Sequence, residues 1–176
     1  MRYGQGAVIA VSLAWLLVAC QGRQEIHTLR TTNRCTQCRL RRVNLAGHHL
    51  PKAILMGTDF TGADLRGAVL TGADLRKVNF RNANLTGANL EGANLGEADL
   101  TGANLAGANL RQANLFRAQL SGANLTQTDL RQAVLFGANL THTQLDQADL
   151  VGANYSDSTQ FPPGFDPVAQ LMERLR

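Results

Sequence analysis

The sequence predicts an all-β solenoid, a chain wound into stacked coils around a narrow apolar interior. Three observations predict it. From Leu40 to Tyr155 every fifth residue is large and apolar, which gives 24 consecutive positions, 21 of them Leu. The residue two places before each is small, Ala in 17 of 24, and the residue directly before it is Asp or Asn in 17 of 24. Composition agrees, because 27 Leu and 24 Ala among 176 residues, with 5% aromatic residues, indicate a repeat protein rather than an ordinary globular core.

Residues 1–19 differ from the rest and are predicted to be a signal peptide. Arg2 supplies a positive start, and the apolar run from Ala7 to Ala19 is shorter than the ~20 residues needed to span a bilayer. The run ends in Leu17-Val18-Ala19-Cys20, which resembles the lipobox of bacterial lipoproteins. That resemblance implies cleavage before Cys20 and lipid attachment to Cys20. The alternative is an uncleaved anchor with an incidental cysteine.

Residues 20–34 are expected to be a tether, because the polar stretch from Gln21 to Arg34 shows no apolar periodicity. The repeat follows over residues 35–160. A period of five matches neither the 3.6 of an α-helix nor the 2 of a β-strand. Two apolar residues per unit point inward, and Asp, Asn and Gly at the intervening positions favour frequent bends. Gly62, Gly72 and Gly87, for example, lie two residues after a large apolar residue.

The unit Ala-(Asp/Asn)-Leu-x-x resembles the pentapeptide repeat family across residues 38 to 155. The pentads 88–92 and 103–107 match it closely. The resemblance implies a right-handed quadrilateral β-helix with four pentads per coil, so that 24 pentads make six coils, a rod about 29 Å tall at the spacing of β-structure. Departures at the small inward position are Cys38, Val43, His48, Thr58, Val78, Thr128 and Thr143.

Residues 161–176 are predicted to form a C-terminal cap. Phe161-Pro162-Pro163-Gly164-Phe165 interrupts the pattern, and Asp166-Pro167 is typical of a helix N-cap followed by the first helical residue. Val168, Leu171, Met172 and Leu175 then fall on one face of a short helix. We expect this helix to cover the last coil. The alternative is a helix presented to a partner.

Two cysteines remain beside Cys20. Cys35 and Cys38 both fall in phase with the repeat and should point inward at the first coil, where a disulfide or buried thiols would close the N-terminal end. A thioredoxin-like βαβ setting is absent, and Arg39 stands where a haem-attachment motif needs His. Zinc held by Cys35, Cys38 and His48 is conceivable, although this spacing is unlike that of structural zinc sites.

No arrangement of residues in the sequence indicates catalysis, and we expect neither enzymatic activity nor a cofactor. Asp64, Asp74 and Asp99 occupy the turn position of the repeat, which explains them without acid–base chemistry. The histidines, at positions 27, 48, 49 and 142, accompany no nucleophile in a known motif, and the glycines form no phosphate-binding loop.

Charge is distributed unevenly. Residues 23 to 52 carry seven basic side chains and one acidic one, Glu25, whereas residues 53 to 176 carry nine basic and twelve acidic ones, a net charge of −3. The basic set would lie next to the proposed anchor, where anionic lipid or peptidoglycan could bind it. The alternative is a merely solvated basic end. The seven residues are Arg23, Arg30, Arg34, Arg39, Arg41, Arg42 and Lys52.

Outward positions offer one candidate partner site. If a coil consists of four pentads, Phe116 and Phe136 stack on an outer face, Arg111 and Arg131 stack on the neighbouring one, and Arg117 lies close by. Exposed aromatic rings beside arginine are typical of interface hot spots, and stacked like charges favour an anionic partner. The alternative is tolerated surface variation.

Two classes of function follow. The first is a lipid-anchored scaffold or protein-interaction module of the bacterial cell envelope, on its periplasmic or surface side, with an unidentified protein partner. The second comes from the family's gyrase-binding members, whose acidic rods imitate DNA in the cytoplasm. A net charge of −3 from residue 53 to residue 176 is low for imitating a duplex. Nucleic acid is not an expected partner either, because the basic cluster lacks interleaved aromatic residues.

Overall fold

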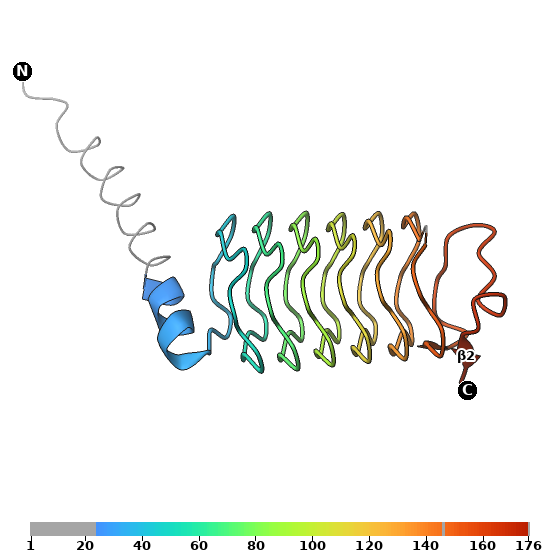
Figure 1. The fold of residues 1–176 in the computed structure, drawn as a ribbon, viewed down its shortest axis with the longest axis horizontal. Helices are drawn as coiled ribbons and strands as arrows, with labels where there is room; N and C mark the ends of the chain where they lie inside the picture. The colour runs from blue at the N-terminus through green and yellow to red at the C-terminus, as the bar shows by residue number, and fades with distance from the viewer. Residues whose placement is uncertain (1–23, 146, 176) are drawn as a thin grey trace, which may run out of the picture.

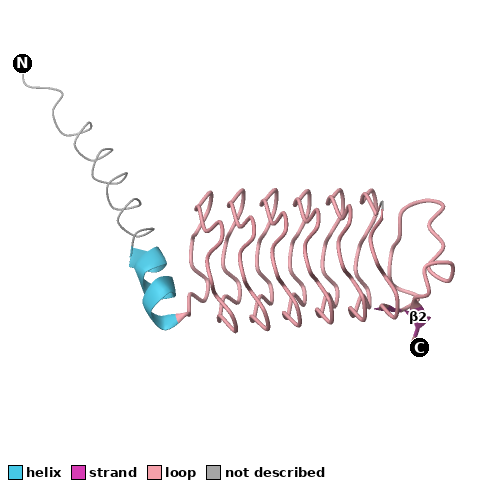
Figure 2. Cartoon of the chain, viewed as in Figure 1, coloured by secondary structure: helices cyan, strands magenta, loops and turns pink. Residues whose placement is uncertain are grey.

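The protein is a straight rod of stacked coils with a short helix at one end and an irregular segment at the other (Figure 1). The computed structural model describes residues 24–145 and 147–175, so the predicted signal peptide and Cys20 lie outside the described residues. Residues 24–32 form the helix, and the only two strands among the described residues, β1 (Asn154–Tyr155) and β2 (Glu173–Arg174), lie near the C-terminus. The chain between the helix and β1 is drawn as loops and turns in Figure 2.

The coils repeat every four pentads. Parallel bridges join every fifth residue to the one that lies four pentads further along the chain, from Arg34–Ile54 to Val134–Asn154. Each side of a coil contributes a single bridging residue, because a turn begins two residues later. Hydrogen bonds run to both neighbouring coils: Leu85 N–H donates to Asn104 O on the next coil (2.7 Å), and Asn84 N–H donates to Ala63 O on the preceding one (2.8 Å). This bonding satisfies the backbone without long strands.

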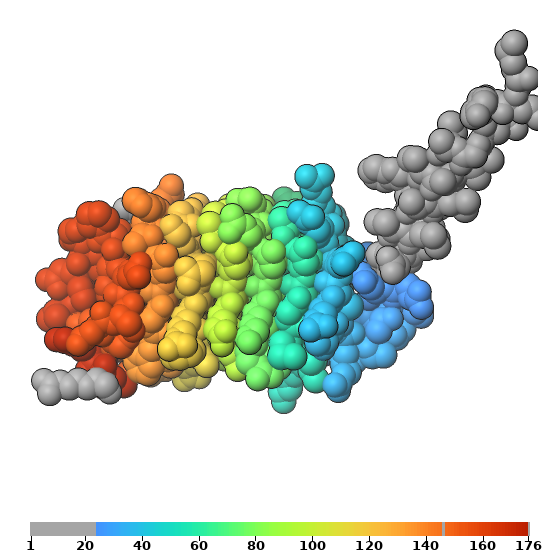
Figure 3. Space-filling view, turned by 180° about the vertical axis from the view of Figure 1, so that it is seen from behind, coloured from blue at the N-terminus to red at the C-terminus, as the bar shows by residue number. Residues whose placement is uncertain are grey.

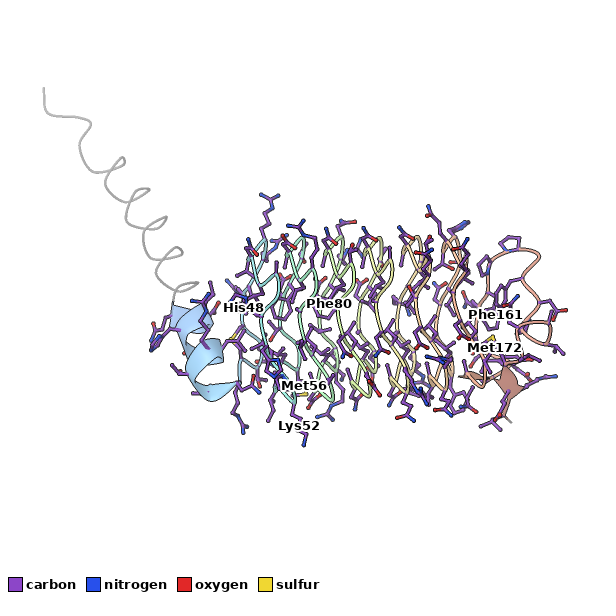
Figure 4. All side chains as sticks on the ribbon, viewed as in Figure 1. His48, Lys52, Met56, Phe80, Phe161 and Met172 are labelled. Atoms are coloured by element: carbon purple, nitrogen blue, oxygen red, sulfur yellow. A yellow bond between two sulfur atoms is a disulfide. The ribbon has the colours of Figure 1, made fainter. Side chains whose placement is uncertain are left out.

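The interior consists of the Leu and Ala columns that the period predicts. The Leu positions from Leu40 to Leu140 are at most 4% exposed, and the alanines two residues before them are at most 1% exposed. Phe60 and Phe80, which lie on successive coils, stack inside with ring centroids 5.3 Å apart (Phe80 is labelled in Figure 4). Buried Thr128 at an Ala position donates its hydroxyl to Leu105 O at 2.9 Å, so its polar group is satisfied.

The turns explain the other repeat positions. The second residue after each Leu has a positive φ, as the third residue of a type II turn requires; Gly107 has φ 65° and Gln112 has φ 58°. The Asn or Asp before the Leu accepts a hydrogen bond from the backbone two residues on, as Asn104 Oδ1 does from Ala106 N–H (3.2 Å). The acidic and amide side chains are therefore turn-forming residues, as expected.

The prediction of a tether over residues 20–34 is wrong for residues 24–32, which form a helix packed against the core. Leu29 is completely buried, and Ile26 packs against the same core, so the helix closes the N-terminal end of the rod. Thr28 and Thr32 donate their hydroxyls to carbonyls four residues earlier, the back-bonding that Thr side chains make within helices. Burial of two apolar side chains three residues apart favours the helix in a segment that is otherwise polar.

The coiled backbone continues past Tyr155, where the five-residue sequence pattern ends, and reaches Gln160. One extra residue enters the turn after Tyr155, so Asn139 bridges to Gln160, one position later than the period would place its partner, and Leu140 N–H donates to Gln160 O (2.7 Å). Thr159 then occupies an Ala position and donates its hydroxyl to Leu135 O at 2.8 Å.

The predicted C-terminal helix is also wrong. Asp166 accepts a hydrogen bond from Val168 N–H (2.9 Å), as an N-cap does, but Leu171 has φ 55° and ends the turn. The chain then pairs β2 with β1 in parallel and buries Met172. Phe161, Phe165 and Met172 pack against the core, whereas Val168, Leu171 and Leu175 are exposed; Phe161 and Met172 are labelled in Figure 4. Pairing with the open edge of the last coil is favoured over an isolated short helix.

Candidate partner-binding corner

One corner of the rod carries the aromatic residues that the sequence singles out. It consists of the turn residues 36–37, 56–57, 76–77, 96–97, 116–117, 136–137 and 156–158, and we call it the aromatic corner. Arg117 N–H donates to Phe136 O (2.9 Å), which holds the Phe116 turn directly beside the Phe136 turn. Phe116 is 38% exposed, and the Arg117 guanidinium lies 4.9 Å from the centroid of its ring. The structure thus brings Phe116, Arg117 and Phe136 together.

Two hollows meet at this corner, because Phe116 lines both. The larger hollow has a volume of about 540 Å³ and extends toward the N-terminus past Met56, Gly96 and the Lys77–Glu97 ion pair. The smaller one has a volume of about 370 Å³. It is lined by Phe116, Arg117, Phe136, Gly137, Ser156, Ser158 and Leu175. Figure 3 shows how closely the coils stack along one side of the rod.

Arg111 and Arg131 lie on a different corner and are not the unrelieved pair of charges that the sequence suggests. Arg131 forms a bidentate pair with Asp129 and a second contact with Asp149 at 3.4 Å. Hydrogen bonds from Arg131 hold the pKa of the Asp129 carboxyl below its ordinary value, partial burial opposes this, and the charge of Arg111 adds to the lowering. Acidic residues of the chain itself therefore relieve the repulsion, and an external anion is unnecessary there.

The basic residues gather at the N-terminal end of the rod. Arg30 lies on the helix and contacts His48 Nε2 at 3.0 Å, while Arg41 lies 3.5 Å from Asp59 in an exposed pair. Glu25 accepts a hydrogen bond from Arg39 N–H and offsets part of the charge. Arg34, Arg42 and Lys52 are exposed, and Arg23 lies outside the described residues. His48 and Lys52 are labelled at this end in Figure 4.

Cys35 and Cys38 meet where the helix joins the first coil. Their sulfurs are 1.96 Å apart, a disulfide, with the two Cα atoms 5.5 Å apart. Cys35 is 3% exposed and Cys38 is half-buried. Among the described residues, no three His, Cys, Asp or Glu side chains are grouped so that they could hold a metal ion.

The carboxylates are engaged in turns and ion pairs. Asp64 and Asp74 each form a bidentate pair with the Arg two residues on. Hydrogen bonds from these arginines hold the pKa of both carboxyls below the ordinary value. Such groups stay ionised near neutral pH and are poorly suited to exchanging protons with a substrate.

A coiled β-structure with a turn every five residues is a repeat solenoid. Comparison of the sequence with known protein families identifies which class of solenoid it is. The chain matches the family described as Pentapeptide repeats, in eight copies, over residues 34–72, 66–102, 79–115, 93–132 and 113–152. These matches span more than half of the chain, so this protein belongs to the pentapeptide repeat family. No curated protein matches the chain at a significant level.

Solved structures share the fold. A pentapeptide repeat protein, Rfr23, from the cyanobacterium Cyanothece 51142 is 24% identical, over 79% of this chain and 98% of its own, with a TM-score of 0.51. QnrB1, a plasmid-mediated fluoroquinolone resistance protein, is 16% identical over 84% of this chain and 85% of its own, with a TM-score of 0.52. At these identities the likeness concerns the fold alone. In the part of the chain that the structure describes, no helix is long and apolar enough to cross a membrane.

Sequence reasoning missed part of the aromatic corner. Met56 and Leu175 complete its apolar lining, and Gly96 and Gly137 leave space beside Phe116 and Phe136. The sequence does indicate that Met56 shares this corner, because positions 56, 76, 96, 116 and 136 are spaced by four pentads. Leu175 reaches the corner through the C-terminal strand pairing, which no period in the sequence indicates.

Proposed function

We propose that this protein is a non-enzymatic binding scaffold of the bacterial cell envelope, held to a membrane by lipid on Cys20. The observation that carries the scaffold function is the aromatic corner: outward rings at one corner of a rigid rod whose other outward residues are mostly polar. Rings beside an arginine are the residue types that dominate protein interfaces.

The anchor is supported by residues 1–20, which combine a positive start, an apolar run and Leu17-Val18-Ala19-Cys20. The basic residues of the N-terminal end would face the same membrane, because the helix over residues 24–32 begins only four residues after Cys20. Each basic residue close to an anionic bilayer contributes about 1 kcal/mol, less at high salt. A basic patch would add an electrostatic attachment to that of the lipid.

The test is to express the chain with its native N-terminus, fractionate the cells and measure the intact mass with and without Cys20→Ser. The expected result is a membrane-bound species that begins at Cys20 and carries added lipid mass, both lost in the variant. A cytoplasmic species with unmodified Cys20 would refute the anchor. An assay of gyrase inhibition would then test the alternative of a DNA-mimicking topoisomerase-binding protein.

A further inference from the structure

Outward-facing aromatic residues are confined to one corner of the rod. Between residues 40 and 155 the chain has five aromatic residues, and three of them, Phe60, Phe80 and Tyr155, occupy the inward column. The other two, Phe116 and Phe136, both lie on the aromatic corner, which also holds Met56. At the equivalent turn position, the corner that contains Arg41 and Arg81 carries only Arg, Thr and Ser. The repeat does not require a ring at this position, so the clustering calls for another cause.

The two hollows of the aromatic corner follow one another along the rod axis, and together we call them the groove. Its two parts are lined by residues from every coil between Gln37 and Ser158. Six coil spacings separate residue 37 from residue 157, a length of about 29 Å at ~4.8 Å per coil. An extended peptide rises by about 3.3 Å per residue, so roughly nine residues would fill this length.

The backbone offers a hydrogen-bond donor at the C-terminal part of the groove. Along this corner each turn donates to the next coil, from Gln37 N–H to Met56 O (2.9 Å) through Arg117 N–H to Phe136 O (2.9 Å). The series ends at Gly137, whose N–H makes no hydrogen bond to another residue within 24–145 or 147–175. The residue inserted after Tyr155 widens the next turn and accounts for the break. Gly137 lines the smaller hollow, so a peptide carbonyl there can accept this bond.

The two ends of the groove differ in how their basic side chains are paired. Arg76 is paired with Asp74 and Lys77 with Glu97. None of the ion pairs among the described residues involves Arg117, which lies over the Phe116 ring instead. A carboxylate of a partner would gain a charge-assisted hydrogen bond from Arg117.

We propose that the aromatic corner binds an extended peptide segment of another protein, with an acidic side chain opposite Arg117 and a large apolar side chain in the hollow between Phe116, Phe136 and Leu175. This inference rests on the proposed function as a binding scaffold and specifies the partner's chemistry. The apolar side chains, the backbone of Gly137 and the side chain of Arg117 all belong to residues that line the smaller hollow. An acidic-apolar peptide can contact all three.

The experiment selects ten-residue peptides from a random display library on the purified, detergent-solubilised full-length protein. Enriched peptides are then synthesised, and their affinity is measured by fluorescence anisotropy. We expect enrichment of Asp or Glu close to Phe, Leu or Met. Phe116→Ser with Phe136→Ser should weaken binding at least tenfold, and so should Arg117→Glu.

Matched controls change other corners. Ala106→Ser with Thr126→Ser alters two outward turn residues on successive coils, and Arg42→Glu reverses a charge at the same turn position as Arg117. Both should leave the affinity unchanged, and circular dichroism checks that every variant is folded. No enrichment, enrichment of basic peptides, or equal binding to the corner variants would overturn the proposal. So would binding of N-acetylglucosamine oligomers at this corner in place of peptides, because the occupant would then be a glycan.

This result is separable from the anchor. Peptide binding by a protein with unmodified Cys20 would support the peptide-binding groove and refute the lipid anchor. A lipid-modified protein that binds no peptide would support the anchor and refute the groove.

Discussion

The stack of Phe60 on Phe80 provides a direct test of the four-pentad coil. Both side chains are fully buried in the same interior column, with centroids 5.3 Å apart and ring planes inclined by 17°. Most other positions of these columns are Leu, so Phe→Leu replaces each ring by the residue that the repeat prefers. The two substitutions are made singly and together.

The expected magnitude follows from the contact. Each single substitution should lower the free energy of unfolding by about 1 kcal/mol, because hydrophobic replacements close in volume cost less than ~1.5 kcal/mol. Aromatic pairs at this separation contribute about 0.5–1.5 kcal/mol beyond buried area. Either single change removes the whole pair, so the double variant should be about 1 kcal/mol more stable than the sum of the single effects predicts.

Urea denaturation followed by circular dichroism measures the three variants in a chain that begins at residue 20, in which Tyr155 is the sole Tyr and no Trp is present. The transition must coincide with that seen by Tyr155 fluorescence, because stacked repeats do not always unfold in two states. Phe60→Leu combined with Leu100→Ala is the control. Residues 60 and 100 are two coils apart, and their effects should add within about 0.5 kcal/mol. Additivity in the Phe60–Phe80 cycle would refute the register.

Three further predictions concern the turns, the ion pairs and the N-terminal end. Gly107→Ala should lower the free energy of unfolding by about 1 kcal/mol, measured by urea denaturation, because φ is 65° although no atom lies within 4 Å of the new Cβ; an unchanged midpoint would contradict this. The pKa of Asp129 is lowered in the folded protein by hydrogen bonds from Arg131, so its stabilisation is present above the unfolded pKa of ~3.9 and is lost as pH falls through the folded value. Asp129→Asn should therefore reduce stability at pH 7 by less than about 1 kcal/mol and have no effect at the acid end of a pH 2–7 unfolding series; a constant difference would contradict it. For Cys35 and Cys38, intact mass should rise by about 2 Da on reduction, and hydrogen exchange in residues 24–32 should accelerate, because the disulfide adjoins the helix that covers the first coil; free thiols in the protein purified without reductant would contradict it.

The interior of the rod could be predicted from the sequence because its cause is local and repeated. Every unit places a Leu and an Ala inward and an Asn or Asp in a turn, so columns, turns and buried side chains follow from the period. The ends could not be predicted in this way. The helix over residues 24–32 depends on Ile26 and Leu29 meeting the first coil, and two apolar residues give too weak a period to indicate it.

At the other end, the helical spacing of Val168, Leu171 and Leu175 was misleading. Met172 and the backbone of β2 find partners in the preceding coil, and this long-range pairing is invisible to a local pattern. The aromatic corner was found only in part for the same reason. The four-pentad spacing indicates which outward residues share a corner, but the widened turn after Tyr155 and the arrival of Leu175 depend on the three-dimensional end of the rod.

The straight rod separates the two proposed binding regions. Phe136 lies five coils from the coil that begins near Thr36, a distance of about 24 Å along the axis at ~4.8 Å per coil. The Debye length at physiological ionic strength is ~8 Å, so exposed charges at the N-terminal end are screened from the smaller hollow by about three such lengths. A membrane held by the basic end would therefore neither attract nor repel a peptide at Arg117. Changes such as Arg42→Glu and Arg117→Glu should then act independently, the first on membrane binding and the second on peptide affinity.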